Sequence, residues 1–246
     1  MDQTPYFLYL AGIFLAAVVG AIPPLVGKWS DRQLHRFVAL GAGVFLGAVF
    51  FHLVPESVAT YPGVLTELSL LSGFMLVLFV ERVLVRHRHV DCEEQELHRH
   101  QVMSLSAFLG LSLHSLMAGL ALGAGLTRSG SSLIIFLAIV SHKSVAAFSL
   151  ATVFRLAALP SRRVLTLLLI FALITPLGAL ISLPLLNVLT EVHLAIPNSL
   201  AAGSFIYVAT MDLLPEAFHD DKKRLGTFIF LSLGIALMWG LRLLGL

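Results

Sequence analysis

The chain has 246 residues, of which 58% are hydrophobic and only 12% charged, and its mean hydropathy is +0.93. A soluble domain carries about twice that share of charged residues, so the composition excludes an ordinary soluble protein and predicts a multispanning membrane protein. The net charge of +2 is too small to indicate nucleic-acid binding, and the single Cys92 excludes an internal disulfide framework.

The apolar residues form eight blocks long enough to cross a bilayer, and their continuity favours helices over a β-barrel. We expect transmembrane helices near residues 5–27, 36–56, 65–86, 102–126, 130–157, 163–188, 194–218 and 224–245. The third is the weakest, because its uncharged stretch, 68–80, has only 13 residues. No basic stretch precedes the first block, so we expect a retained span rather than a signal peptide. Residues 1–246 would then form a single polytopic membrane domain.

The Lys and Arg residues alternate between the connections. Thirteen of the sixteen lie in the first, third, fifth and seventh connections, whereas the second and sixth hold none. Cytoplasmic connections carry such an excess of positive charge. We therefore expect the odd connections to be cytoplasmic and both termini to lie outside. The short chain, without a long extramembrane domain, favours the plasma membrane of a bacterium, the inner membrane.

The second and seventh spans each end in a Pro-Glu motif. HLVPES places His52 and Glu56 on one helix face, and MDLLPE places Asp212 and Glu216 in the same i, i+4 relation. The proline before each glutamate predicts a bend. These residues can be solvated helix ends. Their functional interpretation is an outer entrance at His52 and Glu56 that collects cations, and an inner exit at Glu216 and His219 that releases them.

The connection between the third and fourth spans, 87–101, is rich in histidine. It follows Arg86 and holds His87, His89, His98 and His100. Histidine-rich tracts bind transition metals weakly. This segment is therefore predicted to be a cytoplasmic loop that either binds metal or is only solvated.

One histidine lies near the middle of each of the fourth and fifth spans, His114 and His142. The short link between the spans makes them antiparallel neighbours, so the two imidazoles can face each other and share a metal ion. The structural alternative is that each histidine only forms a hydrogen bond to a neighbouring helix. Lys143 costs about 3 kcal/mol at this depth and should point into the bundle. The segment GLALGAG after His114 predicts close helix packing.

Together these motifs resemble the ZIP family of divalent metal transporters. The resemblance is carried by HSLMAGLALG, SHKSVAAFSL, HLVPES and AAGSFIYVATMDLLPE, and it covers nearly the whole chain. It implies a ZIP-like all-α bundle that takes up zinc or iron toward the cytoplasm, often as a homodimer. It also implies an elevator-like movement of spans one, four, five and six against spans two, three, seven and eight.

The chain departs from the family at two carboxylates. Family members typically carry a glutamate four residues after each histidine, where this sequence has Ala118 and Ala146. Members with a lysine after the second histidine can lack the second glutamate. We therefore expect one reduced site rather than a two-metal centre, with Lys143 replacing the charge of the second ion. The predicted ligands are His114, His142, Ser115 and Asp212.

The sequence thus predicts a transporter rather than an enzyme, which moves Zn²⁺, or Fe²⁺, Cd²⁺ or Mn²⁺, through the bilayer into the cytoplasm. The metal is substrate, and no cofactor and no nucleic acid are expected. Two alternatives stay open. The missing carboxylates would also fit a ZIP-like protein that senses metal without carrying it. His52, His114 and His142 could instead hold the zinc of a membrane hydrolase.

Overall fold

The computed structural model describes residues 4–85, 92–128, 132–185, 191–219 and 224–244. All regular structure in these ranges is helical, as the sequence predicted. The elements are α1 (Thr4–Val26), α2 (Asp31–Ala48), η1 (Val49–Leu53), α3 (Val54–Thr60), α4 (Val64–Phe79), η2 (Val80–Val85), α5 (Cys92–Arg128), α6 (Ser132–Leu156), α7 (Ser161–Leu185), α8 (Glu191–Tyr207), η3 (Val208–Leu213), α9 (Leu214–Ala217) and α10 (Arg224–Leu243). Elements labelled η are π-helical turns: η1 and η3 each join two helices into a continuous rod, and η2 continues α4.

Six of the described rods are long and apolar enough to cross a membrane. They are Tyr6–Val26, Asp31–Thr60, Val64–Val83, His100–Gly123, Ser161–Leu185 and Arg224–Leu243. Large apolar side chains such as Leu8, Leu71 and Leu177 are exposed on the outside of the bundle, where a bilayer would cover them. The protein is therefore a multi-pass membrane protein. The α6 and α8 rods fall outside the six, so the count of eight spans and the external termini stay predictions.

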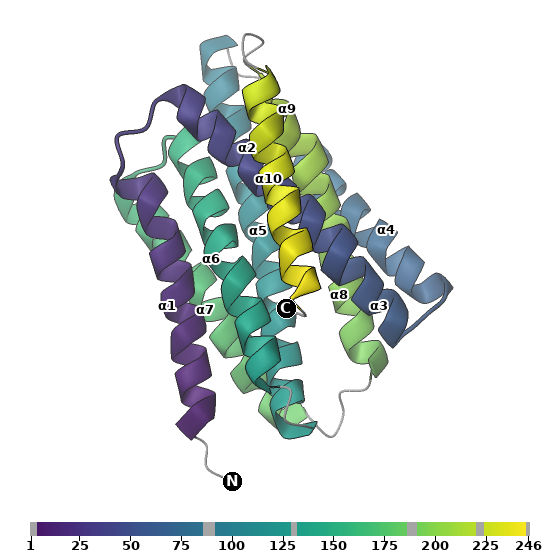
Figure 1. Cartoon of the computed structure of the whole chain (residues 1–246). Helices are drawn as coiled ribbons and strands as arrows, with labels where there is room; N and C mark the ends of the chain where they lie inside the picture. The colour runs from purple at the N-terminus through teal and green to yellow at the C-terminus, as the bar shows by residue number, and fades with distance from the viewer. Residues whose placement is uncertain (1–3, 86–91, 129–131, 186–190, 220–223, 245–246) are drawn as a thin grey trace.

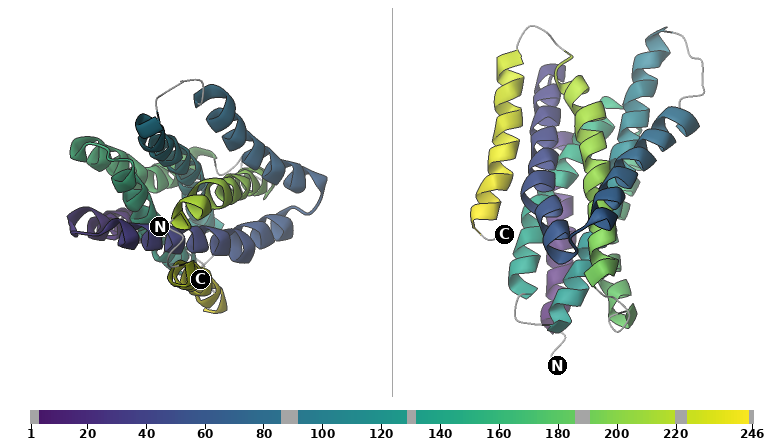
Figure 2. Two further views of the ribbon diagram at one scale, coloured as in Figure 1. Left: turned by 90° about the horizontal axis from the view of Figure 1, so that it is seen from above. Right: turned by 90° about the vertical axis from the view of Figure 1, so that its right-hand side faces the viewer.

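The rods run side by side in alternating directions, with α4 inclined to the rest (Figures 1 and 2). The closest pairs are α2 with α10, α5 with α7, α1 with α6, and α4 with α8. Helices α1, α5, α6 and α7 form one group, which also has contacts between α1 and α7 and between α5 and α6. The other rods form a second group, and the two groups meet chiefly where α5 contacts α8 and where α2 contacts α6.

Glycines allow the paired helices to approach closely. A Cβ atom added at Gly119 of α5 would collide with the Thr175 carbonyl of α7, and one at Gly43 of α2 would collide with the Leu231 carbonyl of α10. Gly20 of α1 has the same relation to the backbone of α6. Small residues serve this purpose in membranes, where apolar burial gives little drive for helix association. The predicted packing role of the GLALGAG segment is confirmed at Gly119.

The two Pro-Glu motifs each follow a π-helical turn. η1 precedes Pro55 and η3 precedes Pro215. Because proline has no N–H group, it cannot continue the i to i−4 ladder, and the turn widens before it. The two turns carry His52 and Asp212, so the helix irregularities fall on predicted site residues.

The structure differs from the predicted loop at 87–101. Helix α5 begins at Cys92, so the backbone of residues 92–101, including His98 and His100, is helical. Residues 86–91, with His87 and His89, lie outside the described residues. Helix α5 therefore extends through this charged stretch, beyond the apolar block that defined the predicted span.

Candidate functional site

One cavity joins the predicted entrance to the two central histidines. It has a volume of about 280 Å³, and its lining includes His52 and Glu56 from the η1–α3 turn, His114 from α5 and His142 from α6. These residues were predicted separately from three spans. The fold therefore brings the predicted entrance and centre into one continuous space.

The two central histidines face each other, as their antiparallel helices predicted. Their ring centroids are 5.5 Å apart, and the rings are tilted by 54°. His114 is 8% exposed, and its Nδ1 atom is buried without a hydrogen-bond partner among the described residues. A buried imidazole nitrogen without a partner lacks the compensation that a water molecule or a metal ion would supply.

The two predicted entrance residues, His52 and Glu56, have different surroundings. His52 Nε2 lies 3.2 Å from the Met238 carbonyl oxygen of α10, to which it can donate a hydrogen bond. This contact places the proton of a neutral ring on Nε2 and leaves Nδ1 as the acceptor. Glu56 is exposed and is the one carboxylate among the described residues that line this cavity.

The position of the missing carboxylate also faces the cavity. Ala118 lines it one turn beyond His114, so a glutamate there would enter the same space. Ala146, in contrast, is 7% exposed and belongs to the main apolar core. The two departures from the family pattern are therefore not equivalent in position.

Further polar or soft side chains line the cavity but were not predicted as site residues, among them Thr60, Met117, Ser141 and Asn198. Met117 lies three residues after His114, so the helical repeat could have identified it. Asn198 comes from α8, and its Nδ2 donates to Ser57 Oγ at 3.1 Å. No local pattern indicates Asn198, because only the tertiary fold brings α8 to this cavity.

Lys143 points away from the cavity and is 2% exposed. Its Nζ donates to Ser115 Oγ of α5 at 2.7 Å and to the Phe171 carbonyl of α7 at 3.0 Å, and lies 3.6 Å from the centroid of the Phe171 ring. Lys143 points into the bundle, as predicted, and its amine contacts a hydroxyl, a carbonyl and an aromatic ring there. Ser115 accepts from this amine and is not among the described residues that line the cavity, so its role as a ligand stays a prediction.

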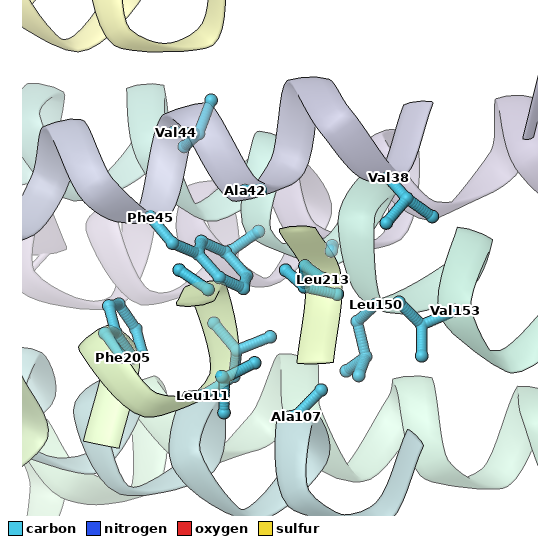
Figure 3. Close-up of a cluster of buried hydrophobic side chains, with 14 of the residues drawn as sticks. Val38, Ala42, Val44, Phe45, Ala107, Leu111, Leu150, Val153, Phe205 and Leu213 are labelled. Atoms are coloured by element: carbon cyan, nitrogen blue, oxygen red, sulfur yellow. The ribbon is translucent and has the colours of Figure 1, made fainter. Parts of the chain in front are cut away.

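An apolar cluster, which we call the plug, closes the bundle beyond the histidines. Phe45 of α2 stacks on Phe205 of α8 with ring centroids 5.1 Å apart, and the Phe205 ring lies 4.8 Å from that of His114. Figure 3 shows these rings beside Leu111, Ala107 and Leu213. On α5, Leu111 and Ala107 lie about one and two turns before His114, toward the end of the bundle opposite the entrance. The plug therefore lies between the central histidines and the predicted exit.

The predicted exit residues lie beyond the plug. Asp212 is 7% exposed and its Oδ2 accepts a 2.9 Å hydrogen bond from Ser106 of α5, so it is not beside the central histidines. Glu216 is 1% exposed, and its Oε1 lies 3.1 Å from His35 Nε2 and 3.0 Å from His100 Nε2. The side chain of His219 is exposed. The structure thus pairs Glu216 with two histidines that were not predicted as its partners.

No group of three or more His, Cys, Asp or Glu side chains in the described ranges is already spaced as a metal site. His52, His114 and His142 share a cavity but do not form such a group. The three-histidine centre that a zinc hydrolase would need is therefore not assembled among these residues.

Comparisons with known proteins agree with the motifs. The family model described as "ZIP Zinc transporter" matches residues 85–242. The chain is 29% identical to "Zinc transporter ZIP1" of Takifugu rubripes, over 95% of this chain and 95% of that protein. It is 29% identical to "Zinc transporter ZIP9-B" of Xenopus laevis, over 92% and 90% of the two chains, and 25% identical to "Zinc transporter ZIP2" of Homo sapiens, over 91% and 93%. The similar proteins are named as transporters rather than enzymes.

Proposed function

The chain belongs to the ZIP zinc transporter family, and on that premise we propose that it carries Zn²⁺ across a membrane into the cytoplasm. The observation that carries the proposal is the cavity shared by Glu56, His52, His114 and His142, which is closed by the plug on its far side. Such a cavity, open on one side of a central site, fits one of the two states of an alternating-access transporter.

The proposed direction rests on the Lys and Arg residues of the chain. The connections at the end that holds Glu216 carry most of the positive charge, so we place that end in the cytoplasm. The end that holds Glu56 then faces outward. The inner membrane of a bacterium is the location that we propose.

Entry would begin at the exposed Glu56 carboxylate, which attracts a cation, and at His52 beside it. The ion would then pass to His114 and His142, whose rings are 5.5 Å apart. Imidazole ligands suit Zn²⁺, whereas harder ions such as Mn²⁺ prefer carboxylate and water. Because Ala118 supplies no carboxylate, we propose one weakly bound ion at the centre, with water completing its ligands.

Release requires the plug to move. We propose that the group of α1, α5, α6 and α7 slides against the other rods and carries the two histidines with it. Lys143 supports such a rigid unit, since it bonds to both Ser115 of α5 and Phe171 of α7 from its own helix α6. The ion would leave through the region of Asp212 and Glu216, with Asp212 as a passing ligand rather than part of the central site.

Metal uptake by proteoliposomes tests this proposal. We expect His114→Ala and His142→Ala each to reduce Zn²⁺ uptake by at least about tenfold, since changes merely adjacent to a metal site already cost about 10–100-fold. Ser141→Ala, which changes another lining residue of the same cavity, is the matched control and should retain uptake. Undiminished uptake in both histidine variants would refute the central site.

The missing carboxylate at Ala118 favours one other function, a metal sensor with the same fold. Zn²⁺ binding by the wild-type protein without any flux into proteoliposomes would support the sensor and refute the transporter. A panel with Fe²⁺, Cd²⁺ and Mn²⁺ beside Zn²⁺ would define selectivity.

A further inference from the structure

A second cavity, which we call the side cavity, lies apart from the one that joins the histidines. It has a volume of about 260 Å³ and shares no lining residue with the first cavity. Its walls come from the end of α4 and from η2, from α5 between Val102 and Leu113, and from α8. The surface that it offers is apolar, so water, which needs polar partners, is not a suitable occupant.

The side cavity opens sideways, between α4 and α5. Three of its lining residues, Leu76 of α4 and Leu105 and Leu109 of α5, are about half exposed. They belong to two of the six rods that are long and apolar enough to cross a membrane. Helix α8 contacts both α4 and α5 and forms the floor between them. The side cavity is therefore a groove in the lipid-facing surface and is accessible from the hydrocarbon of a bilayer.

A glycine on α5 helps to keep this space open. A Cβ atom added at Gly110 would lie 3.6 Å from the Oγ atom of Ser204 and from a methyl group of Val208, which is an ordinary contact. Gly110 thus differs from Gly119, where the added Cβ would collide with the backbone of α7. Helix packing does not require a glycine at 110. Its effect there is to leave room between α5 and α8.

The side cavity has the length of one leaflet of a bilayer. Its lining on α5 runs over the eleven residues from Val102 to Leu113, about 16 Å at 1.5 Å per residue. The hydrocarbon core of a bilayer is about 30 Å thick, so one leaflet spans about 15 Å. Val102 lies near the start of the apolar rod His100–Gly123. An acyl chain that enters from the leaflet at this end has the length to fill the groove.

Arg82 lies at the same end as Val102, where a lipid headgroup would be. It follows Glu81, which lines the side cavity, and it is close to the end of the rod Val64–Val83. Its Nε atom donates to the Tyr207 hydroxyl at 3.4 Å and lies 3.8 Å from Glu81 Oε1. The Arg82 side chain is 40% exposed and that of Glu81 only 11%, so the accessible charge is positive. A guanidinium has five N–H donors, and those that remain can bind a phosphate.

We propose that the side cavity binds one acyl chain of a phospholipid, whose phosphate contacts Arg82. The apolar walls, the length of one leaflet and the exposed guanidinium each match one part of this ligand. A flexible chain also suits a space whose walls belong to both helix groups, since α5 lies in one group and α4 and α8 in the other. That last argument rests on the proposed transport, whereas the site itself does not.

Mass spectrometry of the intact protein tests the site. Delipidated full-length protein in detergent micelles receives equal amounts of phosphatidylglycerol and of a diacylglycerol with the same acyl chains but no phosphate. We expect the wild-type chain to retain one phosphatidylglycerol molecule, with a preference of at least about tenfold, the size of one hydrogen bond to a charged group. Arg82→Gln should lose this preference, and Arg82→Lys, which keeps the charge, should retain it. Phosphatidylglycerol with short acyl chains should compete poorly.

Two variants fill the side cavity from opposite walls. Leu76→Trp fills it from α4 and Leu109→Trp from α5, and each should release the phosphatidylglycerol. Leu71→Trp is the matched control, because Leu71 is also exposed on α4 but does not line the side cavity. This control should retain the lipid. Thermal unfolding in detergent identifies the variants that are folded, and only these are compared.

A wild-type chain that retains no phosphatidylglycerol, or that retains it no better than Leu76→Trp and Leu109→Trp do, overturns the site. Equal retention of phosphatidylglycerol and diacylglycerol also overturns it. A wild-type dimer that Leu76→Trp dissociates, without any retained lipid, would show that a second copy of the chain covers this face instead. Lipid retention is measured without metal flux, so this proposal and the proposed transport fail separately.

Discussion

Ala118→Glu most directly tests the proposed central site, because it supplies the carboxylate that this chain lacks beside His114. Ala118 lines the cavity four residues after His114, about 6 Å along the helix axis at 1.5 Å per residue. Side chains on a helix lean toward its N-terminus, so a glutamate at 118 would lean toward His114. Because the Lys143 amine is already held by Ser115 and Phe171, it does not have to capture the new carboxylate.

The expected gain follows from the charge of the new ligand. A hydrogen bond to a charged group contributes about 1.5–3 kcal/mol, and we take the contact of the new carboxylate with the ion to be of that order. Each 1.4 kcal/mol corresponds to a factor of about ten in Kd. Ala118→Glu should therefore bind Zn²⁺ about ten- to a hundredfold more tightly than the wild-type protein. Titration calorimetry of the protein in nanodiscs measures this change.

Ala121→Glu separates ligation from general attraction. Ala121 lines the same cavity but lies seven residues after His114, about 10.5 Å along the axis, too far for its carboxylate to share the ion. Its effect should be much smaller than that of Ala118→Glu. Equal gains in the two variants, or no gain in Ala118→Glu, would show that a carboxylate at 118 does not complete the site.

Two further predictions concern packing and orientation. Gly119→Ala should destabilise the protein by about 1–3 kcal/mol, because the added Cβ meets the backbone of α7. An added Cβ at Gly240 meets nothing within 4 Å, so Gly240→Ala should leave the stability unchanged. Thermal unfolding in detergent compares the two variants. The single Cys92 should react with a membrane-impermeant maleimide in inside-out vesicles but not in intact cells. Tyr61→Cys in a Cys92→Ser background should instead react in intact cells. The reverse pattern would overturn the proposed orientation.

The sequence by itself determined the helices and the central pair. A long apolar block forms a helix in a bilayer, since a helix satisfies every backbone N–H and C=O group within the segment. The pairing of His114 with His142 was also predictable, because only a short link separates their helices. For the same local reason, the facing of Ala118 and Met117 into the site follows from the helical repeat around His114.

Only the tertiary structure decided which partners the other polar groups meet. Lys143 could have faced the cavity beside His142, but its amine donates instead to the carbonyl of Phe171 on α7 and to the hydroxyl of Ser115. Glu216 meets His35 across 181 residues of chain, and no spacing in the sequence indicates that pair. The physical reason is that the helical repeat fixes the face on which a residue lies, whereas the neighbour of that face depends on which helices can approach closely. In this bundle that approach is set by the fit of glycines such as Gly119 and Gly43 against a facing backbone.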